Sequence, residues 1–184
     1  MIGRKQTAKY AIIGEYSEGK TLLMTAIGYR DHLKGIPVYS NYHLEYPHTH
    51  ISTMEDLEAV KNGTVLLDEA WYTFDSRSFG TKENKGGSYI LSKLSKRNCD
   101  LYLNMQSMDL IDNRFRDRLQ AILIPQKLLH PSTNNPFALE VSIMKKDKWG
   151  TYTILPSKIY FDVSEILSLY DTSEELDPLK YTAK

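Results

Sequence analysis

The chain has 184 residues, the length of one domain that can bury a core of its own. Its 23 Lys and Arg residues balance 23 Asp and Glu residues, and this zero net charge disfavours a protein that holds nucleic acid through a large basic excess. A single cysteine excludes an intrachain disulfide and suits a reducing cytoplasm, the apolar runs are far too short to span a bilayer, and residues 1–5 lack the apolar core of a signal peptide.

The first predicted elements frame a glycine-rich loop. Residues 10–13 are a short apolar run typical of a strand, and residues 20–33 carry apolar side chains at mostly helical spacing up to Gly35. Between them, residues 14–21 read G-x-x-x-x-G-K-T, the phosphate-binding Walker A loop (P-loop) of nucleoside triphosphatases. The alternative is an ordinary glycine turn, which the strand–loop–helix context disfavours.

This loop predicts a nucleotide and a metal as cofactors. Its backbone N–H groups would point at phosphates, Lys20 would supply a charge to the β- and γ-phosphates, and the Thr21 hydroxyl would ligate Mg²⁺. The helix N-terminus adds a partial positive charge. The loop motif does not separate ATP from GTP. The predicted nucleotide-binding residues are Gly14, Glu15, Tyr16, Ser17, Glu18, Gly19, Lys20, Thr21 and Leu22.

The next elements lead to two adjacent acids. We expect a strand at residues 38–44, and a capping box at residues 52–55 that opens a helix through Lys61. Residues 64–69 are a near-continuous apolar run that ends in Asp68 and Glu69, as in a buried strand of a parallel sheet.

Ligands of open α/β sheets bind at the carboxyl ends of the strands. Asp68 is therefore predicted to hold Mg²⁺ together with Thr21, and Glu69 to orient and polarise the attacking water. The alternative is two solvated acids at the end of a strand.

The remaining sequence continues the alternation of helices and strands. We expect a polar, flexible segment at residues 75–87, a helix from Ser88 to about Lys96, a strand at 101–106, a short charged helix at 109–118 and a strand at 121–124. Residues 137–144 and 151–155 predict a β-hairpin, followed by a short amphipathic helix near 163–170 and a weakly ordered tail from about residue 171. The pattern predicts one α/β domain, residues 1–184, with a mostly parallel sheet covered on both faces.

Further polar residues bear on catalysis. Gln106 ends its strand as the acids end theirs, so it could touch the γ-phosphate or the water, or it could simply be a polar residue leaving a sheet. Phosphoryl transfer is accelerated by several orders of magnitude when an arginine stabilises the developing charge. A neighbouring subunit of a ring could supply that arginine, although each candidate alone also fits a solvated surface charge. The candidates are Arg77, Arg97, Arg114, Arg116 and Arg118.

The order of these motifs resembles the FtsK–HerA superfamily of P-loop ATPases. The motifs are GEYSEGKT, VYSNYHL, LLDEAW, DSRS, SKRN before LYLNMQ, and IDNRFRD, spanning about residues 10–118, and the tail at 169–172 is also similar. Within the superfamily, the likeness is greatest to small genome-packaging ATPases of archaeal and tailless viruses and to zonula occludens toxin-like assembly ATPases of filamentous phages. The P-loop is generic, whereas the Asp-Glu pair followed by SKRN and a strand ending in Gln is more specific.

The resemblance implies a RecA-like core in which the strand at 101–106 lies between the P-loop strand and the Asp-Glu strand. It implies an ATP hydrolase whose catalytic residues include Lys20 and Glu69, with Gln106 as a sensor beside the phosphate. Arg97 is the first choice for an arginine finger, and Arg77 is the second. It further implies a hexameric ring that translocates double-stranded DNA without sequence specificity, docked on a capsid or portal-vertex protein, in the cytoplasm of a host cell or associated with the virion.

Three other functions are compatible with a P-loop. Assembly ATPases of filamentous phages usually continue into a membrane segment and an outer domain, neither of which occurs in these 184 residues. A small P-loop nucleotide kinase would need an arginine-rich lid, but segment 75–87 contains only Arg77. A nucleotide-dependent scaffold without chemistry would not need the acid pair. Contacts to DNA phosphates could come from Lys82, Lys85, Gly86 and Gly87, which otherwise form an ordinary surface loop.

Overall fold

The computed structural model describes residues 7–73, 89–90, 92–110, 116–147, 150–171 and 173–180. Its strands are β1 (Lys9–Ile13), β2 (Val38–Ser40), β3 (Thr49–His50), β4 (Thr64–Leu67), β5 (Asp100–Met105), β6 (Ala121–Leu129), β7 (Pro136–Lys146) and β8 (Tyr152–Asp162). Its helices are α1 (Lys20–His32), α2 (Met54–Ala59), α3 (Ala70–Thr73) and the 3₁₀ turn η1 (Met108–Leu110), and residues 89–90 and 92–96 are also helical. The described helices include none with the length and apolar character needed to cross a membrane.

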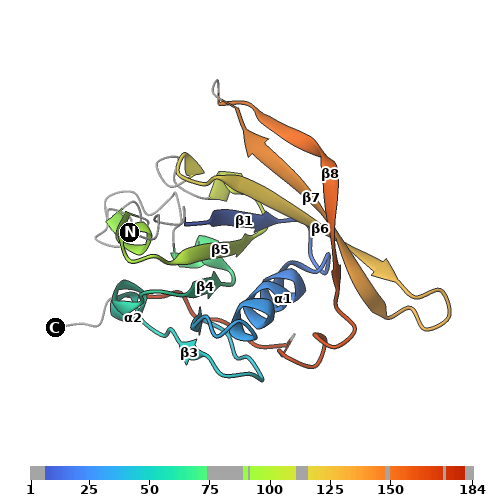
Figure 1. Ribbon diagram of the computed structural model, residues 1–184, viewed down its shortest axis with the longest axis horizontal. Helices are drawn as coiled ribbons and strands as arrows, with labels where there is room; N and C mark the ends of the chain where they lie inside the picture. Colours follow the sequence, from blue (N-terminus) through green and yellow to red (C-terminus); the bar gives the residue numbers. More distant parts are fainter. Residues whose placement is uncertain are drawn as a thin grey trace.

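One eight-stranded sheet organises the chain, in the order β3-β2-β4-β5-β1-β6-β7-β8 (Figure 1). Every neighbouring pair from β3 to β6 is parallel, and the last two pairs are antiparallel. β5 lies between β1, which precedes the P-loop, and β4, which precedes Asp68 and Glu69. This arrangement confirms the predicted mostly parallel α/β core with an additional strand between the two motif-bearing strands.

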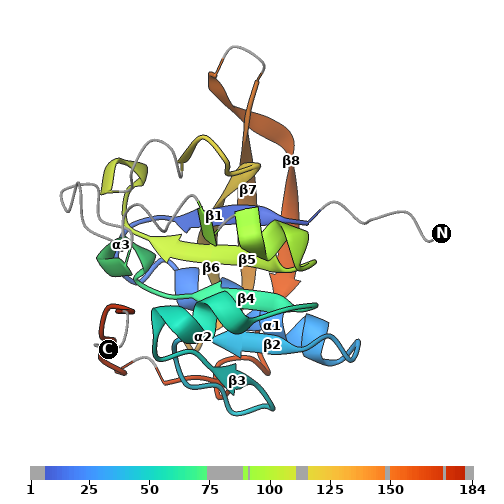
Figure 2. The same cartoon turned by 90° about the vertical axis from the view of Figure 1, so that its left-hand side faces the viewer.

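Helices cover the sheet on both faces, because successive side chains of a buried strand point in opposite directions. In β4, Leu66 packs with α1 on one face, whereas Val65 and Leu67 pack with α2 and with the helical residues Ile90 and Leu94 on the other. Figure 2 shows α2 in front of the sheet and α1 behind it. The two apolar clusters fix the position of β4, and therefore of the acids that follow it.

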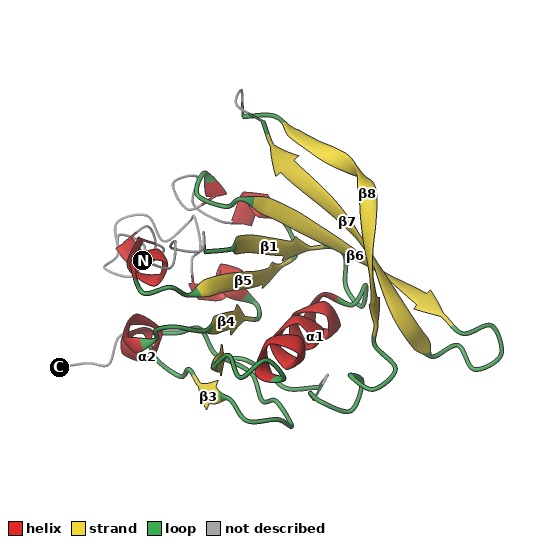
Figure 3. Ribbon diagram, in the orientation of Figure 1, coloured by secondary structure: helices red, strands yellow, loops and turns green. Residues whose placement is uncertain are grey.

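The antiparallel part of the sheet confirms the predicted C-terminal hairpin and is larger than expected. The sequence predicts a strand at 121–124, but β6 continues to Leu129 because β7 pairs with it from Ala121 to Leu129. Only Ala121–Leu123 of β6 pair with β1, so the rest of β6 runs past the end of β1. Figure 3 shows the long ribbon of β7 and β8 extending beyond the parallel strands.

Two predicted elements differ in their ends. The strand predicted at 38–44 ends at Ser40, because the Asn41 side chain leaves the strand pattern and hydrogen-bonds the backbone of Asp68. The capping box was predicted one residue too early. Thr53 is the N-cap of α2, and its side chain accepts a hydrogen bond from the backbone N–H of Asp56, whose carboxylate accepts one from the Thr53 N–H.

The C-terminal part also differs from the prediction. Residues 164–168 form turns instead of the amphipathic helix expected near 163–170, and Tyr170 pairs with Leu44 beyond the end of β2. The tail expected to be weakly ordered packs against the domain: Leu179 is buried, and Lys180 pairs with Thr53. Apolar side chains in this polar tail provide the contacts. The charged helix expected at 109–118 overlaps η1 at its start, but its middle falls outside the described residues, as does the segment predicted at 75–87.

Candidate nucleotide site

The P-loop joins the end of β1 to the start of α1, as its sequence predicts. Gly19 is the N-cap of α1 and has a left-handed backbone, with φ 96°. A Cβ atom at Gly19 would lie 2.8 Å from Leu139 Cδ2 and 3.3 Å from Lys127 Cγ. Both the backbone conformation and the contact with the neighbouring strands therefore require glycine here.

The Lys20 ammonium lies inside the loop. Lys20 is 8% exposed, and its Nζ donates hydrogen bonds to the carbonyl oxygens of Gly14 at 2.9 Å and Glu15 at 2.7 Å. The backbone N–H of Glu15 donates to a carboxylate oxygen of Glu18, at 2.8 Å. A loop amide thus already binds an anionic oxygen, which is the chemistry that a phosphate group requires.

Thr21 and Asp68 connect the P-loop to the end of β4. The Thr21 hydroxyl donates a 2.7 Å hydrogen bond to Asp68 Oδ2, although the two residues are 47 positions apart. Asp68 is buried, and burial raises the pKa of its carboxyl group to about 6, even though hydrogen bonds from Thr21 and from the Glu69 N–H act in the opposite direction. A buried carboxylate of this kind is stabilised by a nearby cation.

Asn104 of β5 lies beside the Thr21 hydroxyl and the Asp68 carboxylate, a position that the sequence analysis did not predict. Its Nδ2 donates to Thr21 Oγ1 at 3.2 Å and also to the Asp68 carboxylate. Its buried Oδ1 has no hydrogen-bond partner among the described residues. Hydroxyl, carboxylate and amide oxygens are ligands of Mg²⁺ or of its bound waters, so these side chains fit the predicted metal. The feature of the sequence that could have identified Asn104 is its polar side chain within the otherwise apolar run of β5.

No group of three or more His, Cys, Asp or Glu side chains in the described ranges could hold a metal ion by itself. Mg²⁺ at this site would therefore use Thr21 and Asp68 together with the phosphates of a nucleotide, which is how proteins commonly bind it.

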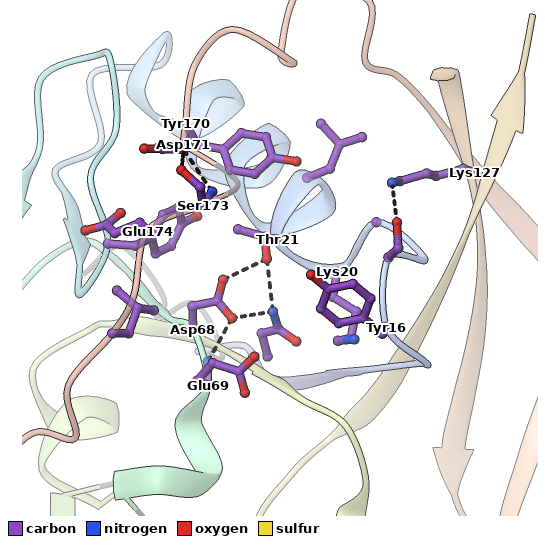
Figure 4. A pocket seen from close by; sticks show the side chains of 16 residues that line it. Tyr16, Lys20, Thr21, Asp68, Glu69, Lys127, Tyr170, Asp171, Ser173 and Glu174 are labelled. Atoms are coloured by element: carbon purple, nitrogen blue, oxygen red, sulfur yellow. Dashed lines mark hydrogen bonds between the residues drawn. The ribbon is translucent and has the colours of Figure 1, made fainter. Parts of the chain in front are cut away.

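The backbone turns sharply at Glu69, just after the end of β4. Its φ of 47° is unusual for a residue with a side chain, and its N–H donates to Asp68 Oδ1 at 2.8 Å. Such a backbone costs about 1–3 kcal/mol and is typical of functional sites. In Figure 4 the Glu69 carboxylate lies beside Asp68 and within the same pocket, where the predicted water-orienting residue is needed.

Asn41 holds the backbone of Asp68 in place, a role that the sequence did not predict. Asn41 Nδ2 donates to the Asp68 carbonyl oxygen at 2.9 Å, and Asn41 Oδ1 accepts from the Asp68 N–H at 2.7 Å. This pair of hydrogen bonds continues the contact between the two strands beyond the end of the β2–β4 ladder and fixes the direction in which Asp68 leaves β4.

The pocket formed by these residues has a volume of about 400 Å³. Lys20 and Lys127 line it on the side of the loop, with the largely exposed Tyr16 at its rim. The acids Asp68, Glu69, Asp171 and Glu174 line it on the side of β4 and of the C-terminal tail (Figure 4). Lysine ammonium groups that suit phosphates thus face the Asp68 carboxylate, a candidate ligand for a cation, across one cavity.

The structure does not bring Gln106 into this pocket. Gln106 follows β5 with an exposed side chain, and Asn104, two residues earlier, lines the cavity instead.

The candidate arginines lie elsewhere. Arg97 precedes β5, at the amino ends of the parallel strands, whereas the pocket lies at their carboxyl ends. Its guanidinium donates to the carbonyl oxygens of Glu58 and Val60, at the end of α2. Arg116 pairs with Asp109 at 3.0 Å, and Arg118 hydrogen-bonds Ser92. Arg77 and Arg114 lie outside the described residues.

Comparison with solved structures identifies similar folds. The N-terminal domain of zonular occludens toxin from Neisseria meningitidis superposes with a TM-score of 0.56 at 19% identity, over 90% of this chain and 100% of that domain. The genome-packaging NTPase of Sulfolobus turreted icosahedral virus 2, solved with AMP and also with ATP-gammaS, gives a TM-score of 0.55 at 12% identity in its AMP complex, over 82% of this chain and 97% of the other.

The DNA-packaging ATPase of Sulfolobus turreted icosahedral virus gives a TM-score of 0.50 at 13% identity, over 81% of this chain and 97% of the other. No family model and no curated protein matches the sequence. At these identities the likeness establishes the fold, and the structures found are of the two kinds that the sequence motifs resemble, a zonular occludens toxin domain and a genome-packaging NTPase.

Proposed function

We propose that this protein is an Mg²⁺-dependent ATP hydrolase that drives double-stranded DNA into a viral capsid. The observation that carries the proposal is the 2.7 Å contact between Thr21 and Asp68, which joins the P-loop to the acid pair across one pocket. The likeness to packaging NTPases solved with AMP and ATP-gammaS supports ATP as the nucleotide.

The chemistry follows from the side chains around the pocket. The loop amides and Lys20 would hold the phosphates. Lys20 would then donate its hydrogen bonds to phosphate oxygens in place of the carbonyl oxygens that it contacts now. Thr21 and Asp68 would hold Mg²⁺, which would neutralise part of the phosphate charge. Glu69 would orient the attacking water and accept its proton. Asn104, whose amide oxygen has no hydrogen-bond partner among the described residues, would accept a hydrogen bond from a water that enters the site.

A ring is proposed because the described part of this chain places no arginine at the pocket. Arg97 lies at the amino ends of the parallel strands, on the far side of the sheet from the pocket of its own chain. As a finger it would therefore have to reach the site of a neighbouring subunit, and it would give up its hydrogen bonds to the end of α2. Arg77, in the segment outside the described residues, is the second choice. Gln106 remains a proposed sensor of the nucleotide.

The cellular part of the proposal comes from the structural relatives. Two of them are named as packaging enzymes, so a hexameric ring, a capsid or portal-vertex partner, and a place in the host cytoplasm or on the virion are proposed for this chain. Lys82 and Lys85 are proposed to contact DNA phosphates in the ring pore.

The second candidate is a virion-assembly ATPase of the filamentous-phage type, which the likeness to the toxin domain favours. It shares the same nucleotide chemistry but needs no stimulation by duplex DNA. A nucleotide kinase receives no support from the described pocket, because no arginine lines it there to act as a lid residue.

An ATPase assay with and without long duplex DNA separates these functions, provided that the assembly mass is measured in the same buffer. The packaging motor predicts Mg²⁺-dependent turnover that duplex DNA stimulates, a stimulation that rising salt removes, and a ring-sized assembly in ATP. The Lys20→Ala variant gives the background rate. An ATP turnover rate that duplex DNA does not change would favour the assembly ATPase. Phosphate transfer to a nucleoside monophosphate would favour the kinase.

A further inference from the structure

Strand β6 carries Lys127 to the rim of the P-loop. β6 stops pairing with β1 at Leu123 and continues, paired with β7, beside the loop that follows β1. Lys127 pairs across the ladder with Leu139 of β7, and these two side chains are the ones that approach Gly19. The position of Lys127 is therefore set by two paired strands and not by a flexible loop.

The Lys127 side chain lies along the loop. A Cβ atom at Gly19 would be 3.3 Å from its Cγ and 3.5 Å from its Cε, so the aliphatic stem is packed against the loop. Its Nζ reaches the hydroxyl of Ser17, at 3.5 Å, and Figure 4 shows this contact at the edge of the pocket. Within the described ranges, none of the ion pairs neutralises the Lys127 ammonium.

We propose that Lys127 is a second phosphate-binding cation, which this chain supplies to its own nucleotide from the side of the loop opposite to Asp68. The inference rests on the proposed function, because it needs a polyphosphate in the pocket. The Lys20 ammonium lies inside the loop, and Lys127 approaches from outside it, beside Ser17, so the two ammonium groups reach the loop from different sides. Together they would neutralise the negative charge of the phosphates that a single Mg²⁺ leaves uncompensated.

The proposal gives Lys127 a role that is distinct from that of an arginine finger. A finger from a neighbouring subunit is present only in the ring, whereas Lys127 belongs to the same chain as the P-loop. The isolated subunit should therefore already bind ADP and ATP with the help of Lys127. AMP lacks the β- and γ-phosphates that the loop holds, so its binding should depend much less on this side chain.

Calorimetric titration of ATP, ADP and AMP into the wild type and three variants tests this assignment. Lys127→Met keeps the packed stem and removes the charge, Lys127→Arg keeps the charge, and Lys145→Met is the matched control. Lys145 is exposed and pairs with Ala121, six positions before Lys127 on β6 and so about 20 Å away along the strand.

We expect Lys127→Met to weaken ATP and ADP binding by about 10- to 100-fold, as for a lost hydrogen bond to a charged group, and to reduce the salt dependence of binding. Lys127→Arg and Lys145→Met should stay close to the wild type, and all melting temperatures should be similar. If Lys127→Met does not fold, Lys127→Gln removes the same charge.

Wild-type affinity in Lys127→Met or Lys127→Gln at low salt, or an equal loss for AMP, would overturn the role of Lys127 and leave the proposed function standing. A wild-type protein that binds no nucleotide would overturn both. The two failures are thus distinguishable in one set of titrations.

Discussion

The Glu69→Gln variant is expected to bind ATP and Mg²⁺ as the wild type does and to hydrolyse ATP about a hundred- to ten-thousand-fold more slowly. Glutamine keeps the size of the side chain and the unusual backbone at this position, where φ is 47°. It cannot accept the proton of the attacking water. The residues proposed to bind the nucleotide and Mg²⁺ make their hydrogen bonds elsewhere: Lys20 to the Gly14 and Glu15 carbonyl oxygens, and Thr21 to Asp68.

Single-turnover hydrolysis and equilibrium binding, measured on the same preparation, separate these two effects. Glu174→Gln is the matched control, because Glu174 lines the same pocket but its carboxylate accepts a hydrogen bond from the His43 N–H in the C-terminal wall. It should retain most of the activity. Equal turnover by Glu69→Gln and the wild type would remove Glu69 from the reaction.

The Asp68→Asn variant is expected to be more stable than the wild type at pH 8 and to lose Mg²⁺-dependent ATP binding. Burial raises the pKa of the Asp68 carboxyl group from 3.8 to about 6, so the folded protein binds this proton more tightly than the unfolded chain does. The stabilisation that comes from the protonated form is complete below pH 3.8 and is lost as the pH rises through 6. Above that pH the buried charge lowers the free energy of unfolding by about 3 kcal/mol, a cost that asparagine avoids.

Thermal unfolding of both proteins in EDTA, at several pH values between 4 and 8, measures this effect. The melting temperature of Asp68→Asn should exceed that of the wild type at pH 8, and the difference should shrink as the pH falls below about 6. A variant that is less stable than the wild type at pH 8 would show that the hydrogen bonds of Asp68 outweigh its desolvation. Retained Mg²⁺-dependent ATP binding would show that Asp68 does not hold the metal.

The sequence predicted the local parts of the site because each is written in adjacent residues. Gly19, Lys20 and Thr21 belong to a continuous loop, and Asp68 and Glu69 follow directly after a buried strand. The position of β5 between β1 and β4 came from the resemblance of the motifs, and the strand order confirms it.

The parts that the sequence missed depend on pairing between distant segments. Asn41 is recognisable only once β2 lies beside β4, and Lys127 only once β7 extends β6 past the P-loop. Alternate residues of a strand share a face, so Asn104 and Gln106 are equivalent in sequence pattern. β5 ends at Met105, and the residue that reaches Thr21 and Asp68 is therefore Asn104, within the strand.

The C-terminal tail shows the same limit. Residues 173–180 are polar, and a composition of this kind predicts weak order. Leu179 is nevertheless buried, and Glu174 and Leu176 line the pocket, because the chain returns along the end of β2. Such contacts could not be read from the tail alone, since each partner lies more than 100 positions earlier in the chain.

Titration of ATP into the wild-type protein, with Mg²⁺ and again with EDTA, tests most directly whether a triphosphate and its metal bind between Lys20, Thr21 and Asp68. We predict saturable binding that is tighter with Mg²⁺ and is lost in Lys20→Ala. Binding that is absent, or that is unaffected by both the metal and the loss of Lys20, would contradict the assignment of this pocket as a nucleotide site.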